Sequence, residues 1–248
     1  MRLRIAAWNV RSMPHPIDQL RLLDDQHTDI VLLQDVGPSA VRAIAESSLW
    51  SHILHTWSTP PVGRLHRRGG CLIATSNGWL LAQLPAGDPL LAHRLLAATA
   101  TRAGTTVSLI SCYAPTNTGP GRNDRPGYFT ALADWLTTVP APTLLAMDAN
   151  GPRVDDPDIA QSIWWTPEES AVLGAGASTS DALRLWYAEH PADFQRRTRH
   201  YPHGPLADSY HRGRKAKYLR SRYDSIRVSP GIHVLDVRYL YDDAVRAG

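Results

Sequence analysis

The chain has 248 residues, of which 43% are hydrophobic and 20% charged, with a net charge of +3 and a sequence pI of about 9.0. These values are typical of a globular protein with a sizeable core, and the positive charge mildly favours an anionic partner. No apolar run is long enough to span a membrane, and the N-terminus lacks the features of a secretory signal. The two cysteines, Cys71 and Cys112, lie in apolar runs and are expected to be reduced core residues. We therefore expect a cytoplasmic protein.

Short apolar runs bounded by polar, proline or glycine residues predict most of the strands. These runs cover residues 3–10, 29–36, 71–76, 105–115, 143–150, 223–229 and 232–240. Apolar residues spaced three or four apart predict helices at 16–27, 126–139 and 181–191. The stretch 151–208 is rich in Asp, Gly, Pro and Ser, which predicts insertions and surface loops there.

Polar residues stand at the ends of these runs. A single polar residue at a strand end is most simply a turn or cap, because Asp and Asn bond to their own backbone. A rigid scaffold also presents functional groups at strand ends, so a repeated pattern favours one shared site. The residues are Asn9, Asp35, Tyr113, Asp148, Asn150 and Asp224.

The same residues carry a resemblance to the endonuclease/exonuclease/phosphatase superfamily, which includes exonuclease III and DNase I-like enzymes. The family motifs W-N, D-I-x-x-L-Q-E and x-Y-x-P are matched by "AAWNV", "DIVLLQDV" and "SCYAP". Its G-D-F-N and R-x-D-x-I motifs are matched by "MDAN" and "RYDSI". The resemblance implies a four-layered α/β sandwich of two mixed β-sheets flanked by helices, formed by a single domain over residues 1–248.

The resemblance also implies a metal-dependent phosphodiesterase, most simply a nuclease acting on DNA or RNA. Asp35 would be the principal ligand of Mg²⁺, with Mn²⁺ as an alternative, and Asn9 would help to fix the metal or its water. Asp148 would orient and deprotonate the attacking water. Asn150 and Tyr113 would hydrogen-bond the phosphate oxygens as charge develops on them.

Two more carboxylates have implied roles. Asp224 would hold a catalytic histidine in the required tautomer. Asp181 resembles part of a family D-A-F-R motif but reads equally well as a helix N-cap. Arg222, directly before Tyr223 and Asp224, would lie near the substrate or serve the structure.

The sequence departs from the family pattern in two places. Asp35 stands where the family has Glu, so its side chain is one methylene shorter. The family's C-terminal S-D-H motif and last strand are not found: the sequence reads "YDDAVRAG" where the motif would begin, and none of the eleven histidines follows His233. Three explanations stay open, namely a longer natural chain, a degenerate relative, or a partner chain that completes the sheet.

A basic stretch with interleaved tyrosines leads into "RYDSI". Basic side chains neutralise phosphates and aromatic rings stack on bases, so this stretch predicts a nucleic-acid contact, although a solvated basic loop is the commoner meaning of such a run. Its substrate-binding candidates are Lys217, Tyr218, Arg220 and Arg222. Two other functions stay open, a phosphatase of a small phosphorylated molecule or lipid headgroup and an inactive nucleic-acid-binding or interaction module.

Overall fold

The structure is a computed structural model. It describes residues 2–11, 16–58, 69–76, 78–116, 119, 121–150, 166–174, 176–200, 206, 210–211, 220–221 and 224–240.

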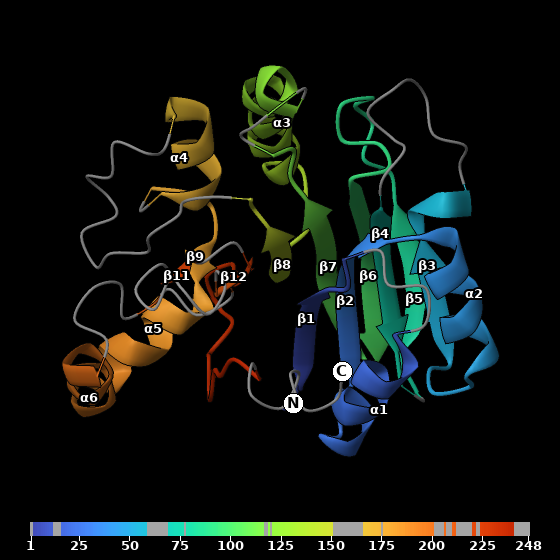
Figure 1. Ribbon diagram of the computed structural model, residues 1–248, viewed down its shortest axis with the longest axis horizontal. Helices are drawn as coiled ribbons and strands as arrows, with labels where there is room; N and C mark the ends of the chain where they lie inside the picture. The colour runs from blue at the N-terminus through green and yellow to red at the C-terminus, as the bar shows by residue number, and fades with distance from the viewer. Residues whose placement is uncertain are drawn as a thin grey trace.

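Two large sheets form the centre of the fold (Figure 1). The first has the order β1-β2-β4-β3, with β1 parallel to β2 and the other pairs antiparallel. Its strands are β1 (Ile5–Asn9), β2 (Ile30–Val36), β3 (His52–His55) and β4 (Gly70–Thr75). The second has the order β5-β6-β7-β8-β12-β9, with only β7 and β8 parallel. Its strands are β5 (Leu80–Leu84), β6 (Leu95–Arg102), β7 (Thr105–Tyr113), β8 (Thr143–Asp148), β9 (Ser180–Asp181) and β12 (Asp224–Val228).

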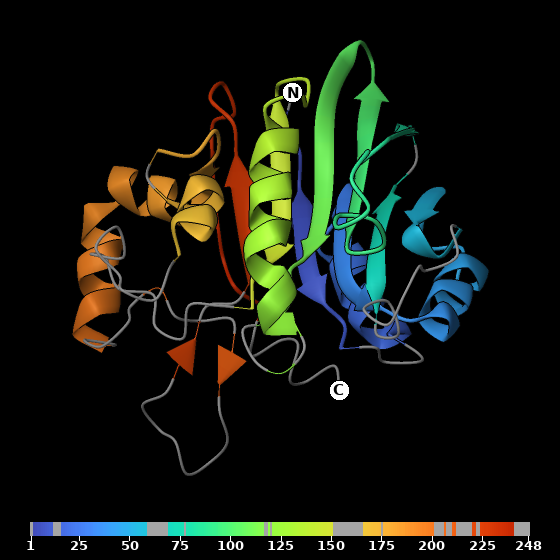
Figure 2. The ribbon, with the colours of Figure 1, turned by 90° about the horizontal axis from the view of Figure 1, so that it is seen from above.

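Helices and one small ribbon complete the described structure. The ribbon pairs β10 (Tyr210–His211) with β11 (Arg220–Ser221) and lies apart from the two large sheets in Figure 2. The helices are α1 (Ile17–Asp25), α2 (Pro38–Glu46), α3 (Gly121–Leu136), α4 (Pro167–Leu173), α5 (Ala182–Glu189) and α6 (Pro191–His200), with a 3-10 turn at Thr56–Ser58.

Three apolar clusters define the layers. Leu20 of α1 and Ile44 of α2 pack with Val31 on the outer face of the first sheet. Phe129 of α3 packs with residues of the second sheet on its outer face, which α3 crosses in Figure 2. A third cluster fills the space between the two sheets. The order helix, sheet, sheet, helix confirms the predicted four-layered sandwich with two mixed sheets.

Most of the predicted strands are present, but residues 232–240 do not form one. In this segment Ile232 and Val234 pack on the cluster between the sheets, while Leu240 packs on the outer cluster of the first sheet. The Tyr239 hydroxyl donates to the Asp224 carbonyl at 2.8 Å. The apolar residues alternate in this sequence because one side of the segment packs on the core. Periodicity alone cannot distinguish such a segment from a paired strand.

The helix predicted at 126–139 begins earlier and ends earlier than expected. It covers Gly121–Leu136 with Pro126 inside it, so proline does not mark its first residue. The helix predicted at 181–191 is present as α5. Two further helices, α4 and α6, lie in the stretch where insertions and surface loops are predicted. They were not predicted, and α6 in particular has few apolar residues to reveal a helical period.

Both cysteines are free and buried, as the sequence predicts. Among the described residues, no helix combines the length and the apolar character that a membrane span requires.

A buried polar contact joins the two sheets. Gln34 of β2 donates through Nε2 to the Ser111 hydroxyl of β7 at 3.0 Å, and Ser111 Oγ donates to the Leu33 carbonyl at 2.8 Å. Both side chains are almost fully buried, and besides Ser111 the Gln34 amide donates to the Leu32 carbonyl of its own strand at 3.1 Å.

We expect Ser111→Ala to reduce the free energy of unfolding by about 1–3 kcal/mol, because the Gln34 amide loses a buried partner. Urea unfolding measures this loss. Thr106→Ala is the control: Thr106 is an exposed residue of the same strand whose hydroxyl meets that of Thr101, and its loss is expected to cost within about 0.5 kcal/mol. Equal losses in both variants would contradict the assigned role of the inter-sheet contact.

Candidate active site

The cluster between the sheets ends in polar residues along one edge. Successive residues of a strand point to opposite faces, so a residue two positions beyond a buried one shares its face. On β8, Leu144 and Ala146 face the first sheet, and Asp148 follows them. Asp148 pairs with Tyr113 of β7 on one side and with Asp224 of β12 on the other. Tyr113, Asp148 and Asp224 therefore lie side by side on the inner face.

Asn9 reaches this row from the other sheet. It ends β1, where Ile5 and Ala7 precede it on the inner face. Its side-chain Nδ2 donates to Asp148 Oδ2 at 2.5 Å, and its Oδ1 accepts from the Arg11 backbone N–H at 2.8 Å. The Asn9 amide thus links the two sheets at the site and orients one oxygen of Asp148.

Asn150 fixes the other oxygen. Its backbone N–H donates to Asp148 Oδ1 at 2.9 Å, and its Nδ2 donates to the Ala114 carbonyl at 2.8 Å. The Asn150 backbone has φ +49°, a left-handed conformation that Asn tolerates better than most residues. Asn150, two residues after the end of β8, is therefore part of a tight turn and also ties that turn to the loop after β7.

Asp35 enters the site through a bulge. Alternation along β2 directs Gln34 inward and would direct Asp35 to the outer face, but the pairing with β4 shifts register between Gln34 and Val36. Asp35 has φ +53°, and a bulge of this kind re-aims a side chain. A Cβ on Gly69 would lie 1.8 Å from Asp35 Oδ1, so only glycine leaves room for the carboxylate.

The carboxylates of Asp35 and Asp148 are close enough for the charge of one to affect the pKa of the other. The pKa of Asp148 is raised to about 6, mainly by burial and also by the charge of Asp35, although hydrogen bonds from Asn150 and Asn9 and the charge of Arg125 lower it. Burial also raises the pKa of Tyr113 to about 12, followed by the charges of Asp35 and Asp148. Asp35, Tyr113 and Asp148 are therefore near neighbours, although they come from different strands.

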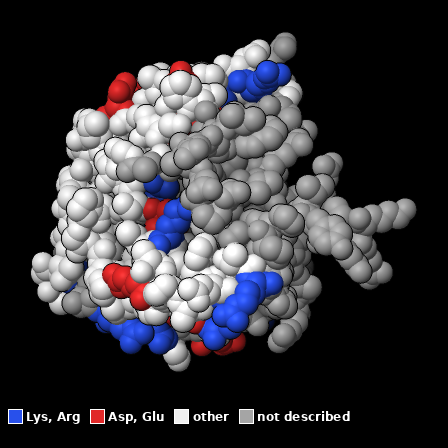
Figure 3. Space-filling model, turned by 90° about the vertical axis from the view of Figure 1, so that its left-hand side faces the viewer, with Lys and Arg blue, Asp and Glu red and all other residues white. Residues whose placement is uncertain are grey.

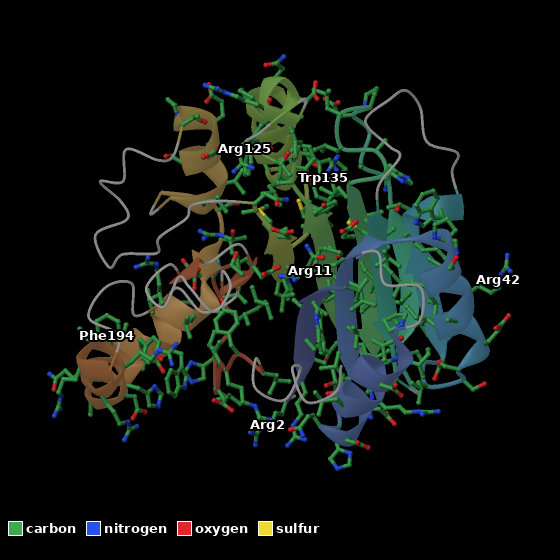
Figure 4. All side chains as sticks on the ribbon, viewed as in Figure 1. Arg2, Arg11, Arg42, Arg125, Trp135 and Phe194 are labelled. Carbon is green, nitrogen blue, oxygen red and sulfur yellow. The ribbon has the colours of Figure 1, made fainter. Side chains whose placement is uncertain are left out.

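Two arginines that the sequence did not indicate lie at this edge. Arg94 precedes β6, its guanidinium lies 5.0 Å from the centre of the Tyr113 ring, and its NH1 donates to the Tyr113 carbonyl at 3.3 Å. Arg11 follows β1 and lies between β1 and β8 in Figure 4. Arg94 was missed because β6 was not predicted, whereas Arg11 stands two residues after Asn9 and could have been noticed.

His93 precedes Arg94, and its ring packs edge-on against that of Trp57. The two ring centroids are 4.5 Å apart and the planes are almost perpendicular.

The remaining candidates divide into those with a clear position and those without. Asp181 is the N-cap of α5, where its Oδ1 accepts from the Leu183 and Arg184 backbone N–H groups. Arg220 lies on β11. Lys217, Tyr218 and Arg222 lie outside the described residues.

Among the basic side chains of the stretch, those of α6 are described. In α6, Arg196 pairs with Asp193. On the side of the molecule shown in Figure 3, basic and acidic side chains of described residues alternate over the surface.

The residues at the edge suit a hard divalent cation. Two carboxylates, Asp35 and Asp148, and the amide oxygen of Asn9 are oxygen donors, and Mg²⁺ binds through one or two carboxylates while it keeps several waters. Within the described ranges, no group of three or more His, Cys, Asp or Glu side chains is gathered as a fully protein-bound metal would require. A partly hydrated ion fits this donor set.

Neither a protein-family model nor a curated protein matches this sequence. Solved structures do match. An AP endonuclease from Archaeoglobus fulgidus is 19% identical, with a TM-score of 0.60 over 92% of this chain and 87% of that chain. The 3' phosphatase NExo from Neisseria, bound to a product DNA hairpin, is 21% identical, with a TM-score of 0.58 over 92% and 87%. D. rerio TDP2, complexed with a single-strand DNA product, is 15% identical, with a TM-score of 0.57 over 92% and 83%. The chain shares the fold of these proteins, which agrees with the resemblance found in its sequence.

The close approach of Gly69 to Asp35 can be tested with a matched pair of glycines. Gly69→Ala brings a Cβ against the Asp35 side chain and backbone, whereas a Cβ on Gly87 meets nothing within 4 Å. Both glycines have positive φ, so in both variants the alanine is forced into a left-handed backbone conformation that favours glycine. We expect Gly69→Ala to lose about 1–3 kcal/mol more than Gly87→Ala in urea unfolding. An equal loss in the two variants would show that the contact with Asp35 is unimportant.

The raised pKa of Asp148 predicts a pH dependence of stability without added metal. Because its folded pKa of about 6 exceeds its ordinary value of 3.8, the folded state binds more protons than the unfolded chain between these values. Stability should therefore fall as pH rises from about 4 to about 6, by on the order of 2–3 kcal/mol. Urea unfolding in EDTA measures the fall, which Asp148→Asn should remove. The same slope in both proteins would contradict the assignment.

Proposed function

We propose that this protein is a divalent-metal-dependent phosphodiesterase that cleaves DNA. The observation that carries the proposal is the convergence of Asp35 and Asp148, from different sheets, at the edge where Asn9, Tyr113 and Asn150 also lie. Two nearby buried or half-buried carboxylates are costly unless they hold a cation or a proton, so their arrangement is typical of a metal or catalytic site.

Asp35, with the amide oxygen of Asn9, would hold Mg²⁺ or Mn²⁺. When bound, the ion supplies a Lewis acid that stabilises negative charge on the leaving oxygen of a phosphodiester. The bulge at Asp35 and the contact with Gly69 fix the direction of this carboxylate before any ligand arrives.

Asp148 would orient and deprotonate the attacking water. A pKa of about 6 leaves its carboxylate mostly ionised at neutral pH and more basic than an ordinary aspartate. Each of its oxygens already accepts a hydrogen bond, one from Asn9 and one from Asn150, so its rotation is restricted. Each oxygen would keep a second lone pair that can accept a hydrogen bond from the water.

Tyr113 and Asn150 would donate hydrogen bonds to the phosphate oxygens. A pKa of about 12 keeps the Tyr113 hydroxyl protonated over the whole working range, so it remains a donor. Asn150 uses one side-chain N–H for the Ala114 carbonyl and has a second N–H for the substrate. Arg94, which contacts the Tyr113 ring and carbonyl, would add positive charge behind the tyrosine.

Asp224 lies beside Asp148 and would orient a general acid. The sequence resemblance implies that this general acid is a histidine, and no such histidine is among the described residues of the site. The role of Asp224 therefore stays a prediction.

DNA is the favoured substrate because two of the solved structures that share the fold contain product DNA. Arg220, Arg222, Lys217 and Tyr218 are the proposed strand-binding residues. One of the two structures is of a 3' phosphatase, so removal of a 3' phosphate from DNA is the second candidate activity. The comparisons give no support to a partner chain that completes the sheet, and we propose none.

We expect Asp148→Asn to reduce DNA cleavage with Mg²⁺ or Mn²⁺ at least 100-fold, since general-base catalysis typically contributes that much. Cleavage of a labelled duplex, a single strand and a 3'-phosphorylated strand measures it. Asp181→Asn is the control, because Asn caps a helix as well as Asp and Asp181 caps α5. Residual cleavage equal to wild type would refute the role of Asp148, and salt-sensitive binding without cleavage by wild type would favour an inactive binding module.

A further inference from the structure

A buried arginine joins the two loops that carry the site. Arg125, on α3, is only 5% exposed. It lies between α3 and α4 in Figure 4. Its NH1 donates to the Pro115 carbonyl at 2.6 Å and to the Ala149 carbonyl at 2.7 Å. The first carbonyl belongs to the loop after β7 and the second to the loop after β8.

The charge of Arg125 is balanced by a helix on the same side of the sheet. Its Nε donates to Oε1 of Glu169 of α4, and the Glu169 side chain is as buried as that of Arg125. Glu169 is itself fixed by a capping box, in which the Thr166 hydroxyl accepts from its backbone N–H and its Oε2 accepts from the Thr166 N–H. The guanidinium is therefore held in one orientation from behind.

The two carbonyls are close in sequence to the reacting groups. Ala149 stands between Asp148 and Asn150, and Pro115 follows Ala114. The loops are also bonded to each other, since the Ala114 N–H donates to the Asp148 carbonyl at 2.9 Å and Asn150 Nδ2 donates to the Ala114 carbonyl. Arg125 adds a third connection, from outside the site, at the point where both loops turn.

We propose that Arg125 and Glu169 form a positioning pair that sets the geometry of the Asp148–Asn150 turn against the loop after Tyr113. The proposal rests on the proposed phosphodiesterase function. Arg125 does not contact the reacting atoms. It acts through the backbone of Ala149 and Pro115, and its charge also lowers the pKa of Asp148.

A purely structural ion pair would behave differently. A buried ion pair can often be replaced by apolar residues of similar size with little loss of stability, because neither charge is then left without a partner. The apolar pair cannot bond to the two carbonyls. Replacement of both residues therefore removes the bonds to the two loops without leaving a buried charge unpaired.

The test compares Arg125→Met/Glu169→Leu with wild type. We expect the double variant to fold with a lowered melting temperature, because the Pro115 and Ala149 carbonyls lose their partner. We expect it to lose about 100-fold in kcat with little change in KM, since a misplacement of about 1 Å can cost that much. Arg125→Lys keeps the charge but loses the planar fork, so its kcat should be intermediate.

Arg227→Met is the matched control. Arg227 of β12 is also buried and donates to a backbone carbonyl at 2.7 Å, that of Thr179, which belongs to neither loop. We expect this variant to lose stability and to keep kcat. A double variant with wild-type kcat, or a control that loses as much kcat as the double variant, would overturn the proposal.

A second readout does not need activity. Amide hydrogen exchange at Ala114 and Asn150, whose N–H groups both bond to Asp148, should accelerate at least tenfold in the double variant and stay unchanged at Leu109 and Leu145 of the same strands. Unchanged exchange at Ala114 and Asn150 would overturn the positioning role. Accelerated exchange in a protein that cleaves no phosphoester would support the pair while refuting the proposed function.

Discussion

The hydrogen bond between Asn9 Nδ2 and Asp148 Oδ2 is the contact on which the candidate site depends. It joins β1 of one sheet to β8 of the other, so it can form only when the sheets are packed at the correct spacing and register. Apolar residues between the sheets provide that packing, and the buried Gln34–Ser111 contact fixes the relative position of β2 and β7. The site is thus a property of the packed sandwich, not of any single strand.

At the edge of the inter-sheet core, polar side chains are buried and depend on hydrogen bonds from their neighbours. Burial gives Asp148 its raised pKa, and the hydrogen bonds from Asn150 and Asn9 and the charge of Arg125 oppose this effect. Backbone strain is concentrated at the same edge: four non-glycine residues there adopt positive φ, namely Arg11, Asp35, His93 and Asn150. Such conformations are retained where the surrounding structure over-determines them, and they commonly accompany functional sites.

The sequence predicted the part of the site that follows from strand alternation. Asn9, Tyr113 and Asp148 each end an apolar run on its inward face, so their positions could be deduced without coordinates. The contributions of Arg94 and Arg125 could not. Arg94 precedes an Ala-rich strand with no clear period, and Arg125 lies in a helix where a charged residue is normally expected to face solvent. Its burial depends on Glu169, which is distant in sequence, and no local pattern reports such a pairing.

At Asp35, the local backbone conformation allows a shorter side chain to serve at the position where the family motif has Glu. The sequence indicates a carboxylate one methylene shorter than the glutamate that the resemblance leads one to expect. Along a regular strand, the side chain would point to the outer face, because Gln34 occupies the inner one. The bulge and the positive φ turn the backbone instead, and Gly69 gives the carboxylate space. Since the charge of Asp35 raises the pKa of both Tyr113 and Asp148, the shorter side chain still reaches the site. The local backbone, which periodicity cannot predict, therefore offsets the loss of reach.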